Sequence, residues 1–238
     1  MKKNIPLEDR IIFALDIPTV DEAKEWVKRL DNVIRFYKVG LQLFLSGWFH
    51  IVDWIVDRGN KVMLDLKFFD VPNTVARAVE QLHGRGVYFA TIHGNDSIIR
   101  AAVENKGDVR LLAVTVLTAF DDNDVRDMLG NRSIMVKDVV YSRVRRAINL
   151  GCDGIVSSGL EVPQLRREFG NSFIVVTPGV RPGREKVMAG DDQKRIVTPG
   201  EAISNGADYI VVGRPIRAAR DPLAVVLEMQ QEIAEVVG

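Results

Sequence analysis

The sequence lacks the residues and patterns that define several large protein classes. It has one cysteine, Cys152, so no internal disulfide can form. Lys plus Arg and Asp plus Glu each number 32, and this balance favours neither nucleic acid nor an anionic membrane as a partner. No apolar run is long enough to cross a bilayer, and no apolar segment follows the first lysines, so we expect no signal peptide. These features predict a cytoplasmic protein.

Metal ligands are also scarce. The three histidines, His50, His83 and His93, do not have the spacing of a metal site, and no cluster of histidine and cysteine occurs. We therefore expect no metal held by the protein. His93 follows an apolar run, and we interpret it as a structural histidine.

Short apolar runs alternate with longer helical patterns along the chain. The predicted strands are 11–15, 35–39, 61–66, 88–92, 110–116, 154–157, 173–177 and 209–212. The predicted helices are 20–30, 41–58, 72–85, 97–105, 136–150, 162–169 and 222–237. Most strands are continuous apolar runs, which is typical of a parallel sheet that helices cover on both faces.

This alternation predicts an α/β fold, a (β/α)₈ TIM barrel in which residues 1–238 form a single domain. An open doubly wound sheet is the alternative. The first strand is not followed by G-x-G-x-x-G, and the number of predicted strands fits a closed barrel, so we favour the barrel. The connections 118–135 and 178–199 are longer than a barrel needs, and such loops are often lids or binding loops.

Charged residues gather at the ends of the first three predicted strands. Asp16 follows the first strand, Lys38 lies near the end of the second, and Asp65 and Lys67 lie at the end of the third. In a barrel these ends are neighbours on one face. The set could be a structural ion-pair network, but buried ion pairs are a poor source of stability. We therefore favour preorganised charge for catalysis.

The ends of the last two predicted strands have the composition of a phosphate site. Arg181 follows the seventh strand, and Gly213 and Arg214 follow the eighth. Barrels often bind phosphate between these two loops, and arginine matches the geometry of a phosphate group. The alternative is a pair of solvated surface arginines. Residues 189–193 form a candidate closing loop, from which Gln193 could reach a polar ligand.

At this point the sequence resembles a known family. The motif at residues 65–74, D-x-K-x-x-D-x-P-x-T, is similar to the signature of the orotidine 5′-phosphate decarboxylases, here in their short bacterial form. Segments that resemble the other motifs of the family follow in order: 15–16, 37–40, 114–118, 177–182, 192–195 and 212–215. Two small departures are Val71, where isoleucine is commoner, and Phe69, where histidine often stands.

The resemblance implies an enzyme that needs no cofactor and converts orotidine 5′-phosphate (OMP) to UMP and CO₂ in pyrimidine biosynthesis. Lys67 would protonate C6 of the pyrimidine, and Asp65 would lie near the substrate carboxylate. The family is homodimeric, so Asp70 and Thr74 would reach into the active site of the neighbouring subunit.

The resemblance also implies the residues that hold the substrate. Asp16 and Lys38 would bind ribose hydroxyls, and Lys38 would belong to the catalytic charges together with Lys67, Asp65 and Asp70. Thr118 would contact the edge of the pyrimidine. The implied phosphate ligands are Arg181, Gln193, Gly213 and Arg214.

Two other functions stay open on the sequence. A metal-dependent sugar-phosphate decarboxylase or aldolase of the same barrel type would share the Asp-x-Lys core and would need a divalent cation. A non-catalytic phosphate-binding barrel is the second alternative, and the complete set of Lys38, Asp65, Lys67 and Asp70 argues against it.

Overall fold

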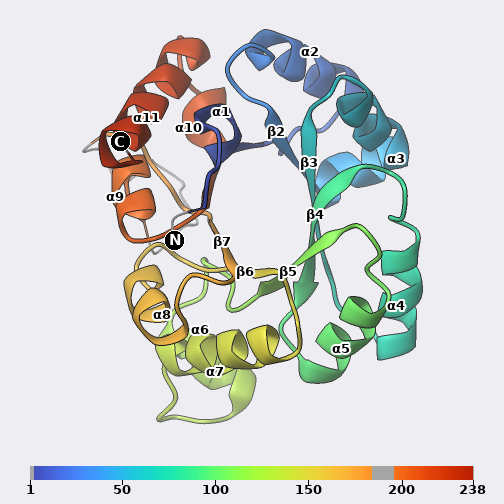
Figure 1. The fold of residues 1–238 in the computed structure, drawn as a ribbon, viewed down its shortest axis with the longest axis vertical. Helices are drawn as coiled ribbons and strands as arrows, with labels where there is room; N and C mark the ends of the chain where they lie inside the picture. The colour runs from blue at the N-terminus through green and yellow to red at the C-terminus, as the bar shows by residue number, and fades with distance from the viewer. Residues whose placement is uncertain (1–2, 184–195, 238) are drawn as a thin grey trace.

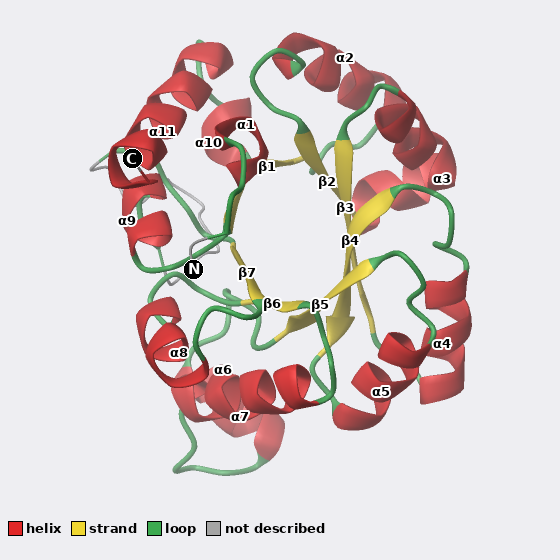
Figure 2. Ribbon diagram, viewed as in Figure 1, coloured by secondary structure: helices red, strands yellow, loops and turns green. Residues whose placement is uncertain are grey.

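The protein is an eight-stranded parallel barrel, as seen in a computed structural model that describes residues 3–183 and 196–237 (Figures 1 and 2). The strands pair in sequence order, and β8 closes the barrel by pairing with β1. This order confirms the predicted barrel and rules out the open sheet. The strands are β1 (Ile11–Ala14), β2 (Phe36–Gly40), β3 (Lys61–Phe68), β4 (Val87–His93), β5 (Arg110–Val114), β6 (Gly154–Val156), β7 (Ile174–Thr177) and β8 (Tyr209–Val212).

Helices surround the barrel on its outer side (Figure 2). In the described part of the chain they are α1 (Leu7–Arg10), α2 (Val20–Leu30), α3 (Leu41–Asp57), α4 (Pro72–Glu80), α5 (Asp96–Glu104), α6 (Asp122–Leu129), α7 (Val136–Asn149), α8 (Val162–Phe169), α9 (Pro199–Ser204), α10 (Arg214–Arg217) and α11 (Pro222–Val237).

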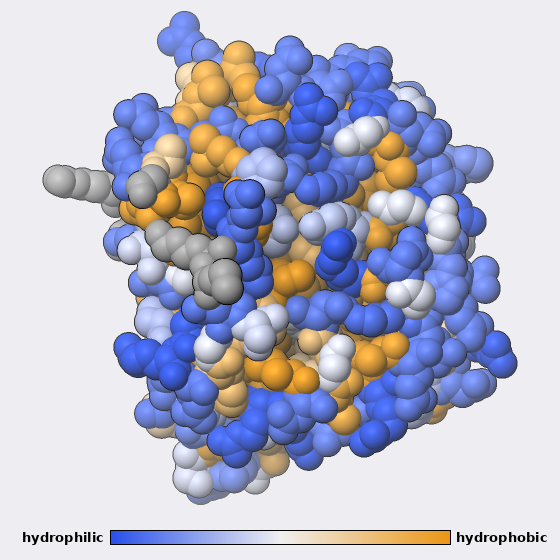
Figure 3. Space-filling model, in the orientation of Figure 1, coloured by the Kyte–Doolittle hydropathy of each residue, from blue (hydrophilic) through white to orange (hydrophobic). Residues whose placement is uncertain are grey.

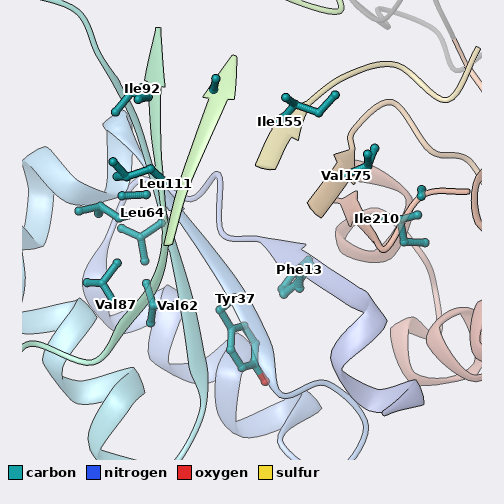
Figure 4. Close-up of a cluster of buried hydrophobic side chains, with 14 of the residues drawn as sticks. Phe13, Tyr37, Val62, Leu64, Val87, Ile92, Leu111, Ile155, Val175 and Ile210 are labelled. Atoms are coloured by element: carbon teal, nitrogen blue, oxygen red, sulfur yellow. The ribbon is translucent and has the colours of Figure 1, made fainter. Parts of the chain in front are cut away.

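The barrel has two apolar layers, because successive strand residues point to opposite faces of the sheet. One layer lies between the strands and the helices and includes Phe13, Tyr37 and Leu64, which are fully buried (Figure 4). The other fills the barrel interior and includes Phe36, Met63 and Phe89. On the face that Figure 3 presents, the surface is mostly hydrophilic, and hydrophobic atoms are seen mainly between polar side chains. The interior layer forms the floor on which a site can be built.

Local sequence signals explain where several helices begin. The hydroxyl of Thr19 accepts a hydrogen bond from the N–H of Glu22 at 3.3 Å and so caps the N-terminus of α2. Pro72 occupies the first turn of α4, where its missing N–H leaves no bond unmade. Because α4 begins directly after β3, this proline fixes where the chain turns away from the end of that strand.

The structure corrects two predictions about helices. The predicted helix 72–85 ends earlier, at Glu80, because residues 81–86 are turns and both Gly84 and Gly86 have a positive φ. The connection 118–135 is not a plain loop, since it contains α6. Asp121 caps this helix and Gly130 ends it in the left-handed conformation.

In the described part of the chain, no helix combines the length and the apolarity that crossing a membrane requires. The proposed closing loop at 189–193, and Gln193 with it, lies outside the described residues.

Candidate active site

A cavity of about 300 Å³ opens at the end of the barrel where the strands finish. Asp16, Lys38, Asp65 and Lys67 line one side of it. Strand register explains why they meet: Ala14 pairs with Lys38, and Gly40 pairs with Asp65, so the ends of β1, β2 and β3 lie next to one another. The structure thus brings together the four charged residues that the sequence placed at these strand ends.

The four side chains form a chain of alternating charge. The Nζ atom of Lys38 lies 2.8 Å from Oδ1 of Asp16 and 3.6 Å from Oδ2 of Asp65. The Nζ atom of Lys67 lies 3.0 Å from the same Oδ2 of Asp65. One carboxylate oxygen of Asp65 therefore faces two ammonium groups. Since Lys38 and Asp65 are both buried, water screens these interactions weakly.

The pKa values of the two buried members reflect this pairing. Burial disfavours the ammonium group of Lys38, but the charges of Asp65 and Asp16 outweigh that effect and raise the pKa of Lys38. Burial also disfavours the carboxylate of Asp65, but Lys38, Lys67 and a hydrogen bond from Thr91 together lower the pKa of Asp65. Both groups are therefore charged at neutral pH.

The backbone around Lys67 departs from regular strand geometry. Lys67 has φ of 50°, and only Trp48 shares a positive φ among the other non-glycine residues that the structure describes. The pairing of β3 with β4 shifts register between Leu64 and Phe68. Such irregularities re-aim side chains and are common next to active sites.

Sequence reasoning missed two residues that hold this part of the site. Thr91 on β4 hydrogen-bonds to both Asp65 and Lys67. Arg217 on α10 donates a hydrogen bond to the backbone carbonyl of Asp16. Thr91 lies two residues before His93 at the end of β4, and residues with that spacing face the same side of a strand. This position could have indicated that Thr91 points into the barrel.

The lining of the cavity also contains the predicted phosphate ligands that the structure describes. Arg181, Gly213 and Arg214 line the cavity, and so does Thr118. Arg181 is buried, with its backbone N–H donating to the carbonyl of Val197 at 3.0 Å and its guanidinium donating to the carbonyl of Val180 at 2.9 Å. It is therefore not the solvated surface arginine of the alternative reading. Gln193 lies outside the described residues.

Two glycines allow the backbone to approach the charged side chains. A Cβ atom on Gly40 would lie 3.2 Å from Nζ of Lys38 and 3.4 Å from Oδ1 of Asp16. A Cβ atom on Gly213 would lie 3.2 Å from Cβ of Ala14. Glycine at position 40 leaves room for the Asp16–Lys38 ion pair, and glycine at position 213 leaves room for Ala14.

The floor of the cavity is apolar. It includes Met63, Val114, Val156 and Val211, which come from four different strands. The cavity thus combines a charged wall, an arginine-containing wall and an apolar floor. This is the composition of a site that binds a small ligand with a few polar groups in fixed places.

Two predicted residues lie apart from this cavity. Asp70 and Thr74 are exposed, and neither belongs to the residues that line the cavity of their own chain. One carboxylate oxygen of Asp70 accepts a hydrogen bond from the N–H of the next residue, Val71, at 2.6 Å. Both residues lie where α4 begins, directly beyond the end of β3.

His93 is also outside the cavity lining. Its ring centroid lies 4.5 Å from that of Phe69, and burial together with the charges of Arg143 and Lys67 lowers its pKa. Across residues 3–183 and 196–237, no three side chains of the metal-binding types are close enough to hold an ion.

Comparison with known proteins gives the family of the chain. The sequence profile of the orotidine 5′-phosphate decarboxylase / HUMPS family matches residues 9–229. The chain belongs to this family. A protein of Methylococcus capsulatus named orotidine 5′-phosphate decarboxylase is 55% identical over 98% of this chain and 96% of its own length. A protein of the same name from Xanthomonas campestris is 46% identical over 96% of this chain and 93% of its own length.

Solved structures agree with this family and with the barrel. The crystal structure of orotidine 5′-phosphate decarboxylase from Lactobacillus acidophilus has a TM-score of 0.81 and 31% identity, covering 94% of this chain and 99% of that one. A Geobacillus kaustophilus protein of unassigned function has a TM-score of 0.79 and 29% identity, with the same coverage. The likeness thus extends over nearly the whole chain in both sequence and fold.

Proposed function

We propose that the protein is an orotidine 5′-phosphate decarboxylase, which converts OMP to UMP and CO₂, and that the cavity at the strand ends is its active site. The observation that carries this proposal is the position of Asp65, whose Oδ2 atom lies 3.0 Å from Lys67 and 3.6 Å from Lys38. Family membership over residues 9–229 supports it independently.

The substrate has three parts, and the cavity offers a matching group for each. Arg181 and Arg214 would bind the phosphate together with the N–H of Gly213, and Gln193 is proposed as a further ligand on the sequence alone. Asp16 and Lys38 would bind ribose hydroxyls. Thr118 would contact the edge of the pyrimidine. Arginine suits the phosphate role because its planar fork matches phosphate oxygens in pairs.

The chemical step breaks the bond between C6 and the carboxylate carbon. Its electron pair stays on C6, CO₂ leaves, and a proton from the ammonium group of Lys67 then adds to C6. Water returns a proton to Lys67 afterwards. The pyrimidine ring delocalises a C6 carbanion poorly, so fixed positive charge next to that carbon lowers the barrier. Lys67 thus serves as electrostatic partner and as acid.

Asp65 would contribute by facing the substrate carboxylate before it leaves. Two like charges in a weakly screened site disfavour the bound ground state, and that repulsion disappears when neutral CO₂ forms. The apolar floor suits a neutral product better than an anion. The binding energy of the distant phosphate would hold the substrate against this repulsion.

We also propose that the protein is a homodimer with shared active sites. Asp70 and Thr74 are exposed and lie outside the cavity of their own chain, which supports a role for them in the site of a second copy. Apolar side chains are exposed within the motif at residues 65–74 and in the first half of α3. They are Leu41, Leu45, Trp48, Phe69 and Val71, with exposed fractions of 56%, 65%, 61%, 65% and 62%. Exposed apolar groups of this number favour burial against a partner.

A spectroscopic assay tests the function directly. Purified protein should remove the absorbance of OMP and form UMP, and an excess of EDTA should leave the rate unchanged. Activity that EDTA abolishes would favour the metal-dependent alternative, and no turnover of OMP in either condition would reject the proposal. We place the reaction in the cytoplasm because it belongs to pyrimidine biosynthesis.

A further inference from the structure

The hydroxyl group of Thr91 links the carboxylate of Asp65 to the backbone of Lys67. Its Oγ1 atom donates a hydrogen bond to Oδ1 of Asp65 at 2.9 Å and accepts one from the backbone N–H of Lys67 at 3.0 Å. Its side chain is 0% exposed. A hydroxyl can donate and accept at once, so Thr91 uses both capacities on neighbouring residues of β3.

The register of β3 and β4 explains why a single residue reaches both partners. Leu64 pairs with Ala90, and the next pair is Phe68 with Ile92. The interval on β3 therefore contains Asp65 and Lys67, whereas the interval on β4 contains Thr91. Two inward-facing side chains of one strand thus face one residue of the other, as expected at a bulge.

The backbone at Lys67 needs such a partner. Lys67 has φ of 50°, a conformation that costs energy for a residue with a side chain. The bulge also takes its N–H out of the regular ladder, and a buried N–H without a partner would be costly. The hydroxyl of Thr91 satisfies this N–H and so stabilises the conformation that aims the side chain of Lys67 into the cavity.

The second hydrogen bond orients the carboxylate of Asp65. Thr91 occupies Oδ1, while Oδ2 faces Nζ of Lys67 at 3.0 Å and Nζ of Lys38 at 3.6 Å. A rotation of the carboxylate would break the bond to Thr91 and move Oδ2 away from the two ammonium groups. Thr91 therefore acts on both members of the Asp65–Lys67 pair from outside the cavity, whose lining it does not join.

We propose that Thr91 is a positioning residue for the decarboxylation, which sets the orientation of Asp65 and the backbone of Lys67 without touching the substrate. This inference rests on the proposed function for its kinetic consequence. Its structural part, the control of two neighbouring groups by one hydroxyl, is independent of the substrate.

The kinetic test compares substitutions that remove or keep the hydroxyl. Thr91→Val keeps the shape of the side chain and removes both hydrogen bonds, so we expect kcat to fall by about 10- to 100-fold. KM for OMP should change little, because Thr91 lies outside the cavity that binds the substrate. Thr91→Ser keeps the hydroxyl and should recover most of the rate. Thr91→Ala serves as a second hydroxyl-free variant if Thr91→Val does not fold.

Thr115→Val is the matched control. Thr115 is equally buried, and its hydroxyl donates to the carbonyl of Val156 at 2.9 Å instead of to a charged residue. The Thr115→Val protein should lose about as much stability as the Thr91→Val protein, and it should keep the wild-type kcat. If Thr91→Ser lost as much kcat as Thr91→Val, the hydroxyl would not be the cause and the proposal would be overturned. If Thr115→Val lost as much kcat as Thr91→Val, the loss would not be specific to Thr91 and the proposal would also be overturned.

Crystal structures of Thr91→Val, or of Thr91→Ala, provide a readout that does not depend on activity. The Asp65 carboxylate or the Lys67 backbone should move by more than about 0.5 Å, the tolerance within which catalytic groups must be held. If both keep their positions, Thr91 does not position them, whatever the rates are. If the wild type fails to convert OMP, the proposed function is wrong, and this structural comparison still decides the role of Thr91.

Discussion

Lys67 is the residue on which the proposed chemistry depends most directly. Its ammonium group lines the cavity and lies 3.0 Å from Asp65. We predict that Lys67→Ala lowers the rate of UMP formation by at least about 10³-fold, since general acids alone contribute up to about 10⁴-fold. Lys61→Ala is the matched control, because Lys61 lies on the same strand and pairs with Asp9 away from the cavity. A Lys67→Ala enzyme with more than a small fraction of wild-type turnover would exclude Lys67 as the proton donor.

Asp65 links the charge chain to the pH dependence of stability. Its pKa is lowered in the folded state by Lys38, Lys67 and Thr91 despite burial. The unfolded chain, with an ordinary pKa of about 3.9, therefore binds a proton first as the pH falls. The stabilisation from Asp65 is fully present above pH ~4 and is lost as pH falls through the folded pKa.

We therefore predict that the wild type loses stability relative to Asp65→Asn as the pH falls from 7 to about 3. The measurement is the unfolding free energy of both proteins in denaturant across this range, with the other carboxyl groups common to both. A constant difference between the two proteins would mean that the pKa of Asp65 is the same in the folded and unfolded chain.

Some residues of the site could be predicted from the sequence and others could not. Asp16, Lys38, Asp65 and Lys67 lie in or just beyond the last residues of apolar strands, so their placement needs only the local pattern and the order of strands in a barrel. Thr91 becomes important only through the register shift between β3 and β4, and that shift depends on contacts between residues far apart in sequence.

At the scale of elements, the strands were predicted well because each is a short apolar run between helical patterns. All eight predicted strands overlap an observed strand, from Ile11–Ala14 to Tyr209–Val212. Helix ends were harder, as α4 illustrates: the helix ends at Glu80, and residues 81–86 form turns in which Gly84 and Gly86 have a positive φ. The short helix α6 was missed even though Asp121 and Gly130 are cap residues, because its eight residues contain few apolar positions.

The loops after β7 and β8 contain the residues that we propose bind the phosphate of OMP. Arg214 lines the cavity at the start of α10. We predict that Arg214→Ala lowers kcat/KM for OMP by about 10²-fold, in the range of a lost hydrogen bond to a charged group. Any residual activity on unphosphorylated orotidine should be nearly unchanged.

Arg220→Ala is the control for this prediction, because Arg220 is exposed and does not line the cavity. It should leave kcat/KM unchanged for both substrates. Equal losses on OMP and orotidine in Arg214→Ala would indicate that Arg214 supports the fold or another part of the substrate.

At the scale of the whole molecule, the barrel explains how residues from opposite ends of the chain reach one cavity. Asp16 near the N-terminus and Arg214 near the C-terminus line the same space because β8 pairs with β1. Arg217 on α10 reinforces this closure by donating to the carbonyl of Asp16. Asp70 does not line this cavity. We therefore ask whether it contributes to the cavity of a second subunit.

A shared active site makes a quantitative prediction for mixtures of two inactive variants. Lys67→Ala and Asp70→Ala homodimers should each be nearly inactive. After subunit exchange, a heterodimer would contain one site with both defects and one site with neither. Random mixing makes about half of the dimers mixed, and each has one intact site of two, so roughly a quarter of wild-type activity should return.

The control for this experiment pairs Lys67→Ala with Asp65→Ala. Asp65 and Lys67 lie 3.0 Å apart on the same strand, so each site of that heterodimer would lack one of them and no activity should return. Mass spectrometry of the mixtures would establish that exchange has occurred. If the Lys67→Ala and Asp70→Ala mixture exchanges and stays as inactive as its parents, Asp70 acts within its own chain, and the exposed apolar side chains near it need a different explanation.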